Sequence, residues 1–437
     1  MNKSTMNYYS THNPVHRVPF SEAVVNGLAP DGGLYMPEVI PSLPENFIAS
    51  LSSISNEQIA FTIARPFIDE NFPDRLLRSI IKDTINFEFP LVQLDDQTCS
   101  LELYHGPTLA FKDVGARFMA LVLRQIANTI QQEITVLVAT SGDTGSAVAH
   151  GFFQVEGIRV VILYPDGKVS ALQEKQFATL GHNIHAVKVD GTFDDCQRLV
   201  KTAFLDAELR KQFFLSSANS INIARLLPQT FYYFFGWKQL QKKESVVFAV
   251  PSGNFGNLTA GIIAKKMGLP VKAFVAATNR NDVVPQYLHT GNFMPRPSVT
   301  TISNAMDVGN PSNFARMLAL YEENWSLMTK DIYGYAFTDD ETLQAIRQVY
   351  QSSSYTLDPH GAVAYLGLKK YQHEHPGTNG IIIETAHPSK FPDVVENALQ
   401  QPLPLHPTLQ GLQHQQVQSV TCSSSYDDFK NLLVVLK

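Results

Sequence analysis

The sequence predicts an α/β protein whose parallel open sheets carry flanking helices. Five short apolar runs, rich in β-branched residues, have the length of buried strands. They lie at residues 134–139, 160–163, 184–189, 246–250 and 271–277. Helix-length stretches separate them, and strand–helix alternation at this spacing is typical of parallel sheets with crossover connections.

The intervening helices are expected in the same order along the chain. The first covers residues 146–153, and the second covers residues 170–180 and ends at Gly181. A third covers residues 193–206, and a fourth ends at Lys266. Because parallel sheets bind ligands at the carboxyl ends of their strands, the loops after these strands are the first candidates for a site.

The N-terminal part of the chain has a different composition. It is richer in proline and turn signals, and it has helix-like stretches at 55–68 and 73–82. We expect residues 1–95 to form a small, mainly helical N-terminal domain.

The rest of the chain divides into a core and a tail. We expect the core at residues 96–402, in two subdomains, with a smaller mobile subdomain at about 105–205. Residues 369–379 read as a polar loop. Residues 403–437 form a C-terminal tail, whose part rich in Gln and Ser we expect to be irregular as far as about residue 425.

The composition excludes several classes of protein. Lys and Arg number 34 and Asp and Glu number 40, so the net charge is −6, whereas nucleic-acid-binding proteins usually carry a basic face. The cysteines Cys99, Cys196 and Cys422 are odd in number and far apart, so we expect neither a metal site nor disulfides. No apolar run approaches the ~20 residues of a membrane span and the N-terminus is polar, so we expect a cytoplasmic protein without membrane contact.

A lysine follows the strand-like segment SLELY in an unusual setting. The stretch LYHGPTLAFKD places Lys112 after a glycine, a proline and several apolar residues. A free lysine has a pKa of about 10.4 and is a poor nucleophile. Burial or a nearby cation would lower that pKa and permit Schiff-base chemistry, although a surface lysine at a helix start would give the same pattern.

Two turns between a strand and a helix are rich in glycine. SGNFGN at 252–257 and TSGDTG at 140–145 would place free backbone N–H groups at a helix start, which favours an anion such as phosphate. SGNFGN does not match G-x-x-x-x-G-K-[ST], so an ATP site is not indicated. Glycine also serves purely steric purposes in tight turns, and Ser141 or Thr144 could simply cap the following helix.

Two further segments bring polar groups together. SANSINIAR carries Asn219, Ser220 and Arg225, and arginine binds phosphate in a bidentate manner. Arg225 could instead pair with a surface carboxylate. IIIETAHPSKF ends a buried strand in Thr385 and His387, but a lone histidine is more often structural than catalytic.

Together these segments resemble one family, threonine synthase, which consists of pyridoxal-phosphate enzymes of the tryptophan-synthase-β fold type. HGPTLAFKD, SGDTG, SANSIN, PSGNFGN and TAHPSK occur in the family's order. SNAMDVGNPSN at 303–313 and SEAVVNGLAPDGGLYMP at 21–37 extend the likeness to nearly the whole chain apart from the tail. The N-terminal segment is similar to the longer branch of the family, which has an extra domain ahead of the core. The resemblance implies a fold type II core with pyridoxal 5'-phosphate as the cofactor.

The resemblance also implies a role for each segment. Lys112 would form the Schiff base with the cofactor, and Thr385 would hydrogen-bond its pyridine nitrogen. Asp143 would face the cofactor, at a position where many relatives of this fold type have asparagine and the longer branch has aspartate. The implied contacts to the cofactor phosphate are Gly253, Asn254, Phe255, Gly256 and Asn257. The implied substrate contacts are Ser141, Gly142 and Thr144 for a carboxylate, and Asn219, Ser220 and Arg225 for a phosphate.

The implied activity is that of a lyase. It converts O-phospho-L-homoserine and water to L-threonine and phosphate by β,γ-elimination and β-hydration. A serine or threonine dehydratase and a phosphohomoserine phospho-lyase of the same fold are alternatives, and so is a binding protein that has lost its chemistry. A nicotinamide dehydrogenase would need G-x-G-x-x-G in the first strand–helix turn, which GNFGN is not. The oligomeric state is left open between a monomer and a homodimer.

Overall fold

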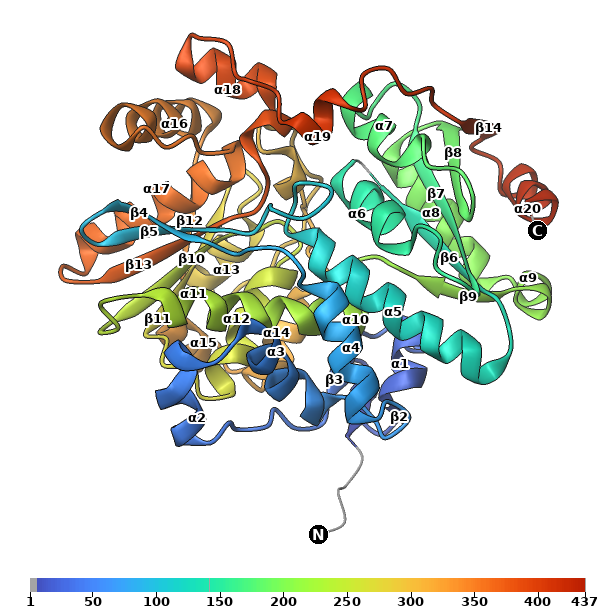
Figure 1. Cartoon of the computed structure of the whole chain (residues 1–437), viewed down its shortest axis with the longest axis horizontal. Helices are drawn as coiled ribbons and strands as arrows, with labels where there is room; N and C mark the ends of the chain where they lie inside the picture. Colours follow the sequence, from blue (N-terminus) through green and yellow to red (C-terminus); the bar gives the residue numbers. More distant parts are fainter. Residues whose placement is uncertain (1–5, 141, 437) are drawn as a thin grey trace.

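Two sheets form the body of the molecule, and a small third sheet lies at its N-terminal end (Figure 1). The computed structural model describes residues 6–140 and 142–436. The first body sheet has six strands and the second has five, and helices flank both. This is the α/β architecture that the alternation of strands and helices predicts.

The six-stranded sheet is parallel except at one edge. In the order in which they pair, its strands are β12 (Ile332–Ala336), β11 (Ala273–Thr278), β10 (Val246–Pro251), β13 (Asn379–Glu384), β5 (Thr98–Glu102) and β4 (Leu91–Asp95). Only β4 runs antiparallel, against β5. Alternate side chains of a strand point to opposite faces. Phe248 therefore packs against Tyr233 on one face, whereas Val247 and Ala249 enter the core of the other.

Helices close both faces of this sheet. The ring of Tyr233 lies on α11 (Thr230–Gln239), which packs beside α12 (Gly256–Lys266) on one face. On the opposite face lies α17 (Pro359–Glu374). The prediction of a polar loop at 369–379 is wrong for residues 369–374, because α17 continues to Glu374. Tyr371 is buried and extends the apolar side of that helix.

The five-stranded sheet is entirely parallel. Its strands, in pairing order, are β14 (Ser419–Ser423), β8 (Ile184–Asp190), β7 (Ile158–Pro165), β6 (Ile134–Ala139) and β9 (Phe214–Ser217). The expected strands at 134–139, 160–163 and 184–189 are confirmed. The helices expected between the strands are confirmed as α6 (Asp143–Phe152), α7 (Ala171–Ala178) and α8 (Phe193–Leu205).

The C-terminal tail is more ordered than expected. It contains α19 (Pro407–Gln410), then β14, and then α20 (Tyr426–Val435). β14 pairs in parallel with β8, and Cys422 and Phe429 are buried in the core beneath it. The expectation of an irregular segment up to residue 425 is therefore wrong at 407–410 and 419–423. β9 and β14, which both follow residue 205, belong to the same five-stranded sheet as β6, β7 and β8.

The N-terminal domain combines a small sheet with helices. Its antiparallel sheet is β2 (Arg17–Pro19), β1 (Asn7–Ser10) and β3 (Tyr35–Pro37). Its helices are α1 (Phe20–Asn26), α2 (Glu45–Ser50), α3 (Asn56–Ala64) and α4 (Asp74–Thr84). The buried guanidinium of Arg316 donates to the carbonyl oxygens of Tyr35 and Ile221, which ties this domain to the core. β4, which lies within the residues expected for this domain, pairs with β5 in the six-stranded sheet.

The remaining α-helices pack around these layers. They are α5 (Lys112–Ile130), α9 (Ala207–Gln212), α10 (Ile223–Leu226), α13 (Val283–Thr290), α14 (Phe314–Leu320), α15 (Trp325–Asp331), α16 (Asp339–Ser353) and α18 (Pro392–Leu399). Within the described part of the chain, none of the helices combines the length and the apolar character needed to cross a membrane.

Candidate active site

Loops that follow strands of both body sheets meet between the sheets. From the six-stranded sheet come 103–112 after β5, 252–257 after β10 and 385–390 after β13. From the five-stranded sheet come Thr140 and residues 142–144 after β6, and residues 218–225 after β9. These are the carboxyl ends of parallel strands, where ligands bind in such folds.

Lys112 is the first residue of α5, and the segment before it pairs with the segment that follows β13. Ala110 forms an antiparallel bridge with Ala386. The N–H of Phe111 donates to the carbonyl oxygen of Thr385 at 2.8 Å. This pairing places Thr385 beside the start of α5, so the expected proximity of Lys112 and Thr385 is present in the fold.

A buried aspartate shapes the turn that leads to Lys112. Asp113 accepts hydrogen bonds from the N–H and the hydroxyl of Thr108. Burial raises the pKa of Asp113 to about 6, although these hydrogen bonds oppose the rise. A Cβ on Gly106 would lie 2.4 Å from Asp113 Oδ2, so the turn needs glycine there. Leu109 adopts a left-handed conformation with φ 58°, which completes the turn.

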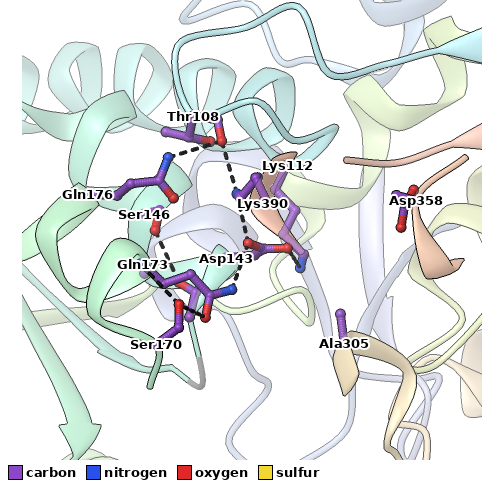
Figure 2. A network of polar contacts seen from close by, with 12 residues as sticks. Thr108, Lys112, Asp143, Ser146, Ser170, Gln173, Gln176, Ala305, Asp358 and Lys390 are labelled. Carbon is purple, nitrogen blue, oxygen red and sulfur yellow. Dashed lines mark hydrogen bonds and ion pairs between the residues drawn. The ribbon is translucent and has the colours of Figure 1, made fainter. Parts of the chain in front are cut away.

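The amine of Lys112 lies in a mostly buried, charged setting (Figure 2). Only 19% of its side-chain surface is exposed, and its Nζ is 3.8 Å from Asp143 Oδ2. Burial lowers the pKa of Lys112, and the charges of Lys390 and Arg225 lower it further, while Asp143 acts in the opposite direction. Lys112 is thus a lysine whose amine loses its proton more readily than a free one.

Asp143 is held by two lysines and an amide. Lys390 Nζ lies 2.7 Å from Asp143 Oδ1, and Gln173 Nε2 donates to the same oxygen at 3.2 Å (Figure 2). Burial would raise the pKa of Asp143, but the charges of Lys390 and Lys112 outweigh burial and hold that pKa well below its ordinary value. Asp143 is therefore an anion at neutral pH.

The hydroxyl of Thr140 accepts backbone N–H groups at the start of α6. Thr140 Oγ1 accepts the N–H groups of Gly142 and Gly145 at 3.0 and 2.8 Å, so Thr140, and not Thr144, supplies a hydroxyl to this turn. Gly142 has φ 143°, and a Cβ there would lie 2.6 Å from the amide of Gln173. Thr144 lies in the first turn of the helix. Ser141 lies outside the described residues.

The GNFGN turn has the form of a phosphate cradle. Phe255 is left-handed, with φ 60°, and the backbone then enters α12. A helix start leaves its first N–H groups without partners in the helix. Gly253 packs so closely that a Cβ would lie 2.6 Å from Met306 Cα. Asn254 fixes the turn from both sides, since it accepts the N–H of Ser312 at 2.6 Å and donates to Ser220 Oγ at 2.6 Å.

Buried donors beside this turn have no partner among the described residues. These are Nδ2 of Asn257 and Nδ2 of Asn313. The Oδ1 of Asn257 is occupied by the hydroxyl of Tyr233 at 2.6 Å, which orients the amide. A Cβ on Gly256 would approach Asn313 Nδ2 to 3.4 Å, so both donors lie at the same turn. Donors at a helix start fit an anion, and the residues present therefore fit the phosphate of a cofactor.

The SANSIN segment lies against the same turn through Ser220. Asn219 has a buried Oδ1 and Arg225 a buried Nε, each without a partner among the described residues. Arg225 is only 4% exposed, and one of its amino groups donates to the carbonyl oxygen of Ala218. The alternative of a surface ion pair for Arg225 is thus wrong. Asn222 is structural, since it caps α10 and donates to the carbonyl oxygen of Val24 at 2.8 Å.

Sequence patterns of three known families match this chain. The family described as "Pyridoxal-phosphate dependent enzyme" matches residues 90–384, "Threonine synthase N terminus" matches 7–85 and "Threonine synthase, C-terminal" matches 361–432. The threonine synthase of Haemophilus influenzae is 49% identical over 407 residues, which cover 92% of this chain and 94% of that protein. The chain belongs to the threonine synthase family.

Solved structures of the threonine synthase family have the same fold. The crystal structure of the Escherichia coli threonine synthase matches with a TM-score of 0.92 at 41% identity, covering 99% of this chain and 100% of that one. The structure of a Brucella melitensis threonine synthase with bound pyridoxal phosphate matches with a TM-score of 0.92 at 34% identity, covering 99% of each chain. The expected family, fold type and cofactor, pyridoxal 5'-phosphate, are confirmed.

Sequence reasoning missed two residues of this threonine synthase site. Lys390 is the last residue of the motif TAHPSK, but the sequence alone indicates no role for it. Gln173 was placed only within a helix. The available signal for Lys390 is its position two residues after Pro388, in the segment that follows a buried strand, whereas nothing local marks Gln173. Among the described residues no group of His, Cys, Asp or Glu is placed to hold a metal ion.

Proposed function

We propose that this threonine synthase acts on O-phospho-L-homoserine and water, and that the residues assembled around Lys112 carry the reaction. The observation that supports the proposal is the hydrogen bond between Asn254 and Ser220. It joins the GNFGN turn to the SANSIN segment beside a buried lysine. Two neighbouring anion-binding segments suit a reaction in which both the cofactor and the substrate carry phosphate.

The cofactor would be held at three points. Lys112 would bind its aldehyde, and the backbone of Gly253, Asn254, Phe255, Gly256 and Asn257 would bind its phosphate. Thr385 would hydrogen-bond the pyridine nitrogen, as an uncharged partner. When bound, pyridoxal phosphate withdraws electron density from the substrate's α-carbon.

Lys112 would move the protons. Its lowered pKa makes the free amine more accessible than in an exposed lysine, and a free amine can accept the α proton of the substrate and later return a proton at Cγ. Asp143 lies 3.8 Å from the amine, close enough to stabilise its protonated form between these transfers. We propose this as the role of Asp143 in the reaction.

The substrate would be oriented by its two ends. The start of α6, with Ser141, Gly142 and Thr144, would bind the carboxylate through hydroxyls and through the positive end of the helix dipole. Asn219, Ser220 and Arg225 would bind the phosphate that leaves. Hydrogen bonds to that phosphate strengthen as charge develops on it, so they lower the barrier more than they stabilise the bound substrate.

Product analysis tests this function. The purified holoenzyme should convert O-phospho-L-homoserine to equal amounts of L-threonine and inorganic phosphate, and Lys112→Ala should not. Phosphate with 2-oxobutyrate in place of threonine would identify a phospho-lyase. Faster turnover of serine or threonine than of phosphohomoserine would identify a dehydratase.

The cellular location and the oligomeric state of the enzyme are also proposals. We propose that it acts in the cytoplasm, which is supported by its three free cysteines, Cys99, Cys196 and Cys422. We propose a monomer or a homodimer, with the N-terminal segment as a domain fixed to the core by Arg316. Sedimentation of the holoenzyme at several concentrations measures the oligomeric state.

A further inference from the structure

Lys390 is a buried cation that the proposed chemistry does not use. It ends the short helix η5 (Pro388–Lys390), just after β13, and only 1% of its side-chain surface is exposed. Its Nζ lies 2.7 Å from Asp143 Oδ1 and donates to the carbonyl oxygen of Thr108 at 2.9 Å. A lysine is almost never buried to this extent unless it is paired.

These contacts join three parts of the site. Asp143 begins α6 beside the five-stranded sheet, Thr108 belongs to the turn that leads to Lys112, and Lys390 lies in η5, which follows β13 of the six-stranded sheet (Figure 2). Gln176 also donates to the carbonyl oxygen of Thr108, at 3.3 Å. Lys390 therefore fixes the position of Asp143 relative to the segment that carries Lys112.

The charge of Lys390 matters as much as its position. Asp143 Oδ1 faces Lys390 and Oδ2 faces Lys112, so one carboxylate lies between two ammonium groups. An anion beside a lysine raises that lysine's pKa, and a cation lowers it. Lys390 thus offsets the rise that Asp143 causes in the pKa of Lys112.

Other charged groups reach the same place from the surrounding elements. Arg225 of α10 and Asp358 at the N-cap of α17 act on Lys112 in opposite directions. His360 of α17 also faces Asp143. These three groups stay unchanged in the variants below, so they do not alter the comparison.

We propose that Lys390 is a positioning residue, which keeps Asp143 ionised and turned toward Lys112 while cancelling the carboxylate's charge, so that the amine of Lys112 is easily deprotonated. The inference rests on the proposed role of Lys112 as the cofactor lysine. A purely structural Lys390 would hold the two sheets together and leave the proton affinity of Lys112 unchanged.

The test is a pH titration of the holoenzyme, followed through the absorption band of its bound cofactor. The midpoint reports the proton on the nitrogen that Lys112 provides, and it needs no turnover. Lys390→Met should raise the midpoint by about one pH unit, because Asp143 is then no longer offset. Asp143→Asn should lower the midpoint, because Lys390 then acts alone. The double variant, with neither charge, should return close to the wild-type midpoint.

The double variant keeps the test decisive if Lys390→Met does not fold. A buried carboxylate without its partner is costly, whereas removal of both charges is often tolerated. The comparison of Asp143→Asn with the double variant then isolates the charge of Lys390. Equal midpoints in these two proteins would overturn the inference. Lys390→Arg, which keeps the charge, should titrate like the wild type.

Lys265→Met is the matched control. Lys265 Nζ lies 2.8 Å from Asp331 Oδ1 and donates to the carbonyl oxygen of Lys272 at 2.9 Å, so it repeats the pattern of Lys390 away from the site. The variant Lys265→Met should leave the midpoint unchanged, and an equal shift in Lys265→Met and Lys390→Met would contradict the proposal.

Borohydride reduction and peptide mapping distinguish a failure of the proposed function from a failure of this inference. Cofactor on another lysine overturns the proposed function, whereas cofactor on Lys112 with unmoved midpoints overturns only this inference.

Discussion

Asn254 and Ser220 are joined by a hydrogen bond of 2.6 Å from Nδ2 to Oγ, which links a helix start of the six-stranded sheet to a loop of the five-stranded sheet. Asn254 also accepts the N–H of Ser312 at 2.6 Å. The two proposed phosphate sites are therefore not independent, because one amide positions residues of both.

Ser220→Ala should impair substrate use more than cofactor binding. The change removes one proposed contact to the leaving phosphate and leaves Asn254 Nδ2 without a partner. We expect KM for O-phospho-L-homoserine to rise by about tenfold, which corresponds to about 1.4 kcal/mol, the scale of one hydrogen bond. Steady-state kinetics and equilibrium titration with pyridoxal phosphate measure the two effects. Ser53→Ala, at an exposed site remote in the chain, is the control, and a larger loss of cofactor than of substrate affinity would contradict the assignment.

Arg225→Gln tests the proposed site of the substrate phosphate. Its guanidinium is buried, and its Nε has no partner among the described residues, so it is poised to donate to a ligand. Burial lowers the pKa of Arg225 to about 10, at which it is still a cation at neutral pH. We expect kcat/KM to fall by about 100-fold, since a charge-assisted hydrogen bond contributes up to about 3 kcal/mol.

Cofactor affinity of the Arg225 variant should change by only a few fold. Arg198→Gln, which removes an exposed arginine paired with Asp195, controls for the loss of positive charge. If Arg225→Gln loses cofactor and substrate affinity equally, Arg225 belongs to the structure of the fold and not to the substrate phosphate site.

The sheets could be predicted from the sequence because buried parallel strands are continuous apolar runs. ITVLVA and VVFAV mark β6 and β10 without any knowledge of their neighbours. β14 could not be recognised in the same way. Its sequence SVTCS is mostly polar, and only its pairing with β8 makes it a strand. Edge strands with one exposed face carry a weak local signal.

The same distinction between local sequence signals and contacts made by folding applies to the site. Lys112 and the GNFGN turn could be predicted because their chemistry is contained in a few consecutive residues. The contact between Lys390 and Asp143 could not, because it joins two segments of different sheets that are far apart in the chain. The burial of Arg225 also depends on packing, since a Cβ on Gly115 of α5 would lie 3.2 Å from its Nε.

His387 gives the fold a dependence on pH. Its Nδ1 accepts the N–H of Ser389 at 3.1 Å, so it caps η5 as a neutral ring. Burial, helped by the neighbouring His406 and His105, lowers the pKa of His387 to about 4. An unfolded histidine binds its proton below about pH 6.5. Between these values the unfolded state binds more protons, so the free energy of unfolding falls as the pH is lowered from 6.5 to 4.

His387→Asn should remove this dependence and keep the cap, because an asparagine Oδ1 can accept the same N–H. The wild type should lose up to about 3 kcal/mol of stability relative to the variant between pH 6.5 and 4. Denaturant unfolding at several pH values measures the difference. His373→Asn changes an exposed histidine and gives the background. The same pH dependence in both variants would show that His387 is not the group responsible.

Gly361 packs so closely against Glu384 that there is no room for a side chain at position 361. A Cβ on Gly361 would lie within bonding distance of Glu384 Oε2, because the buried carboxyl packs against the start of α17 and accepts the N–H of Asp358 at 2.6 Å. Burial raises the pKa of Glu384 well above its ordinary value, and the neighbouring Asp358 raises it further. Gly361→Ala should therefore destabilise the protein by about 3 kcal/mol through overpacking.

Gly361→Ala should also weaken cofactor binding, because Glu384 precedes Thr385 and a displaced carboxyl would shift the end of β13. Thermal unfolding and titration with pyridoxal phosphate measure the two effects. Gly411→Ala is the control, since its Cβ would have no neighbour closer than 3.7 Å and its φ of −59° suits any residue. If Gly361→Ala lowers stability without changing cofactor affinity, the end of β13 tolerates the shift, and Thr385 does not depend on Glu384 for its position.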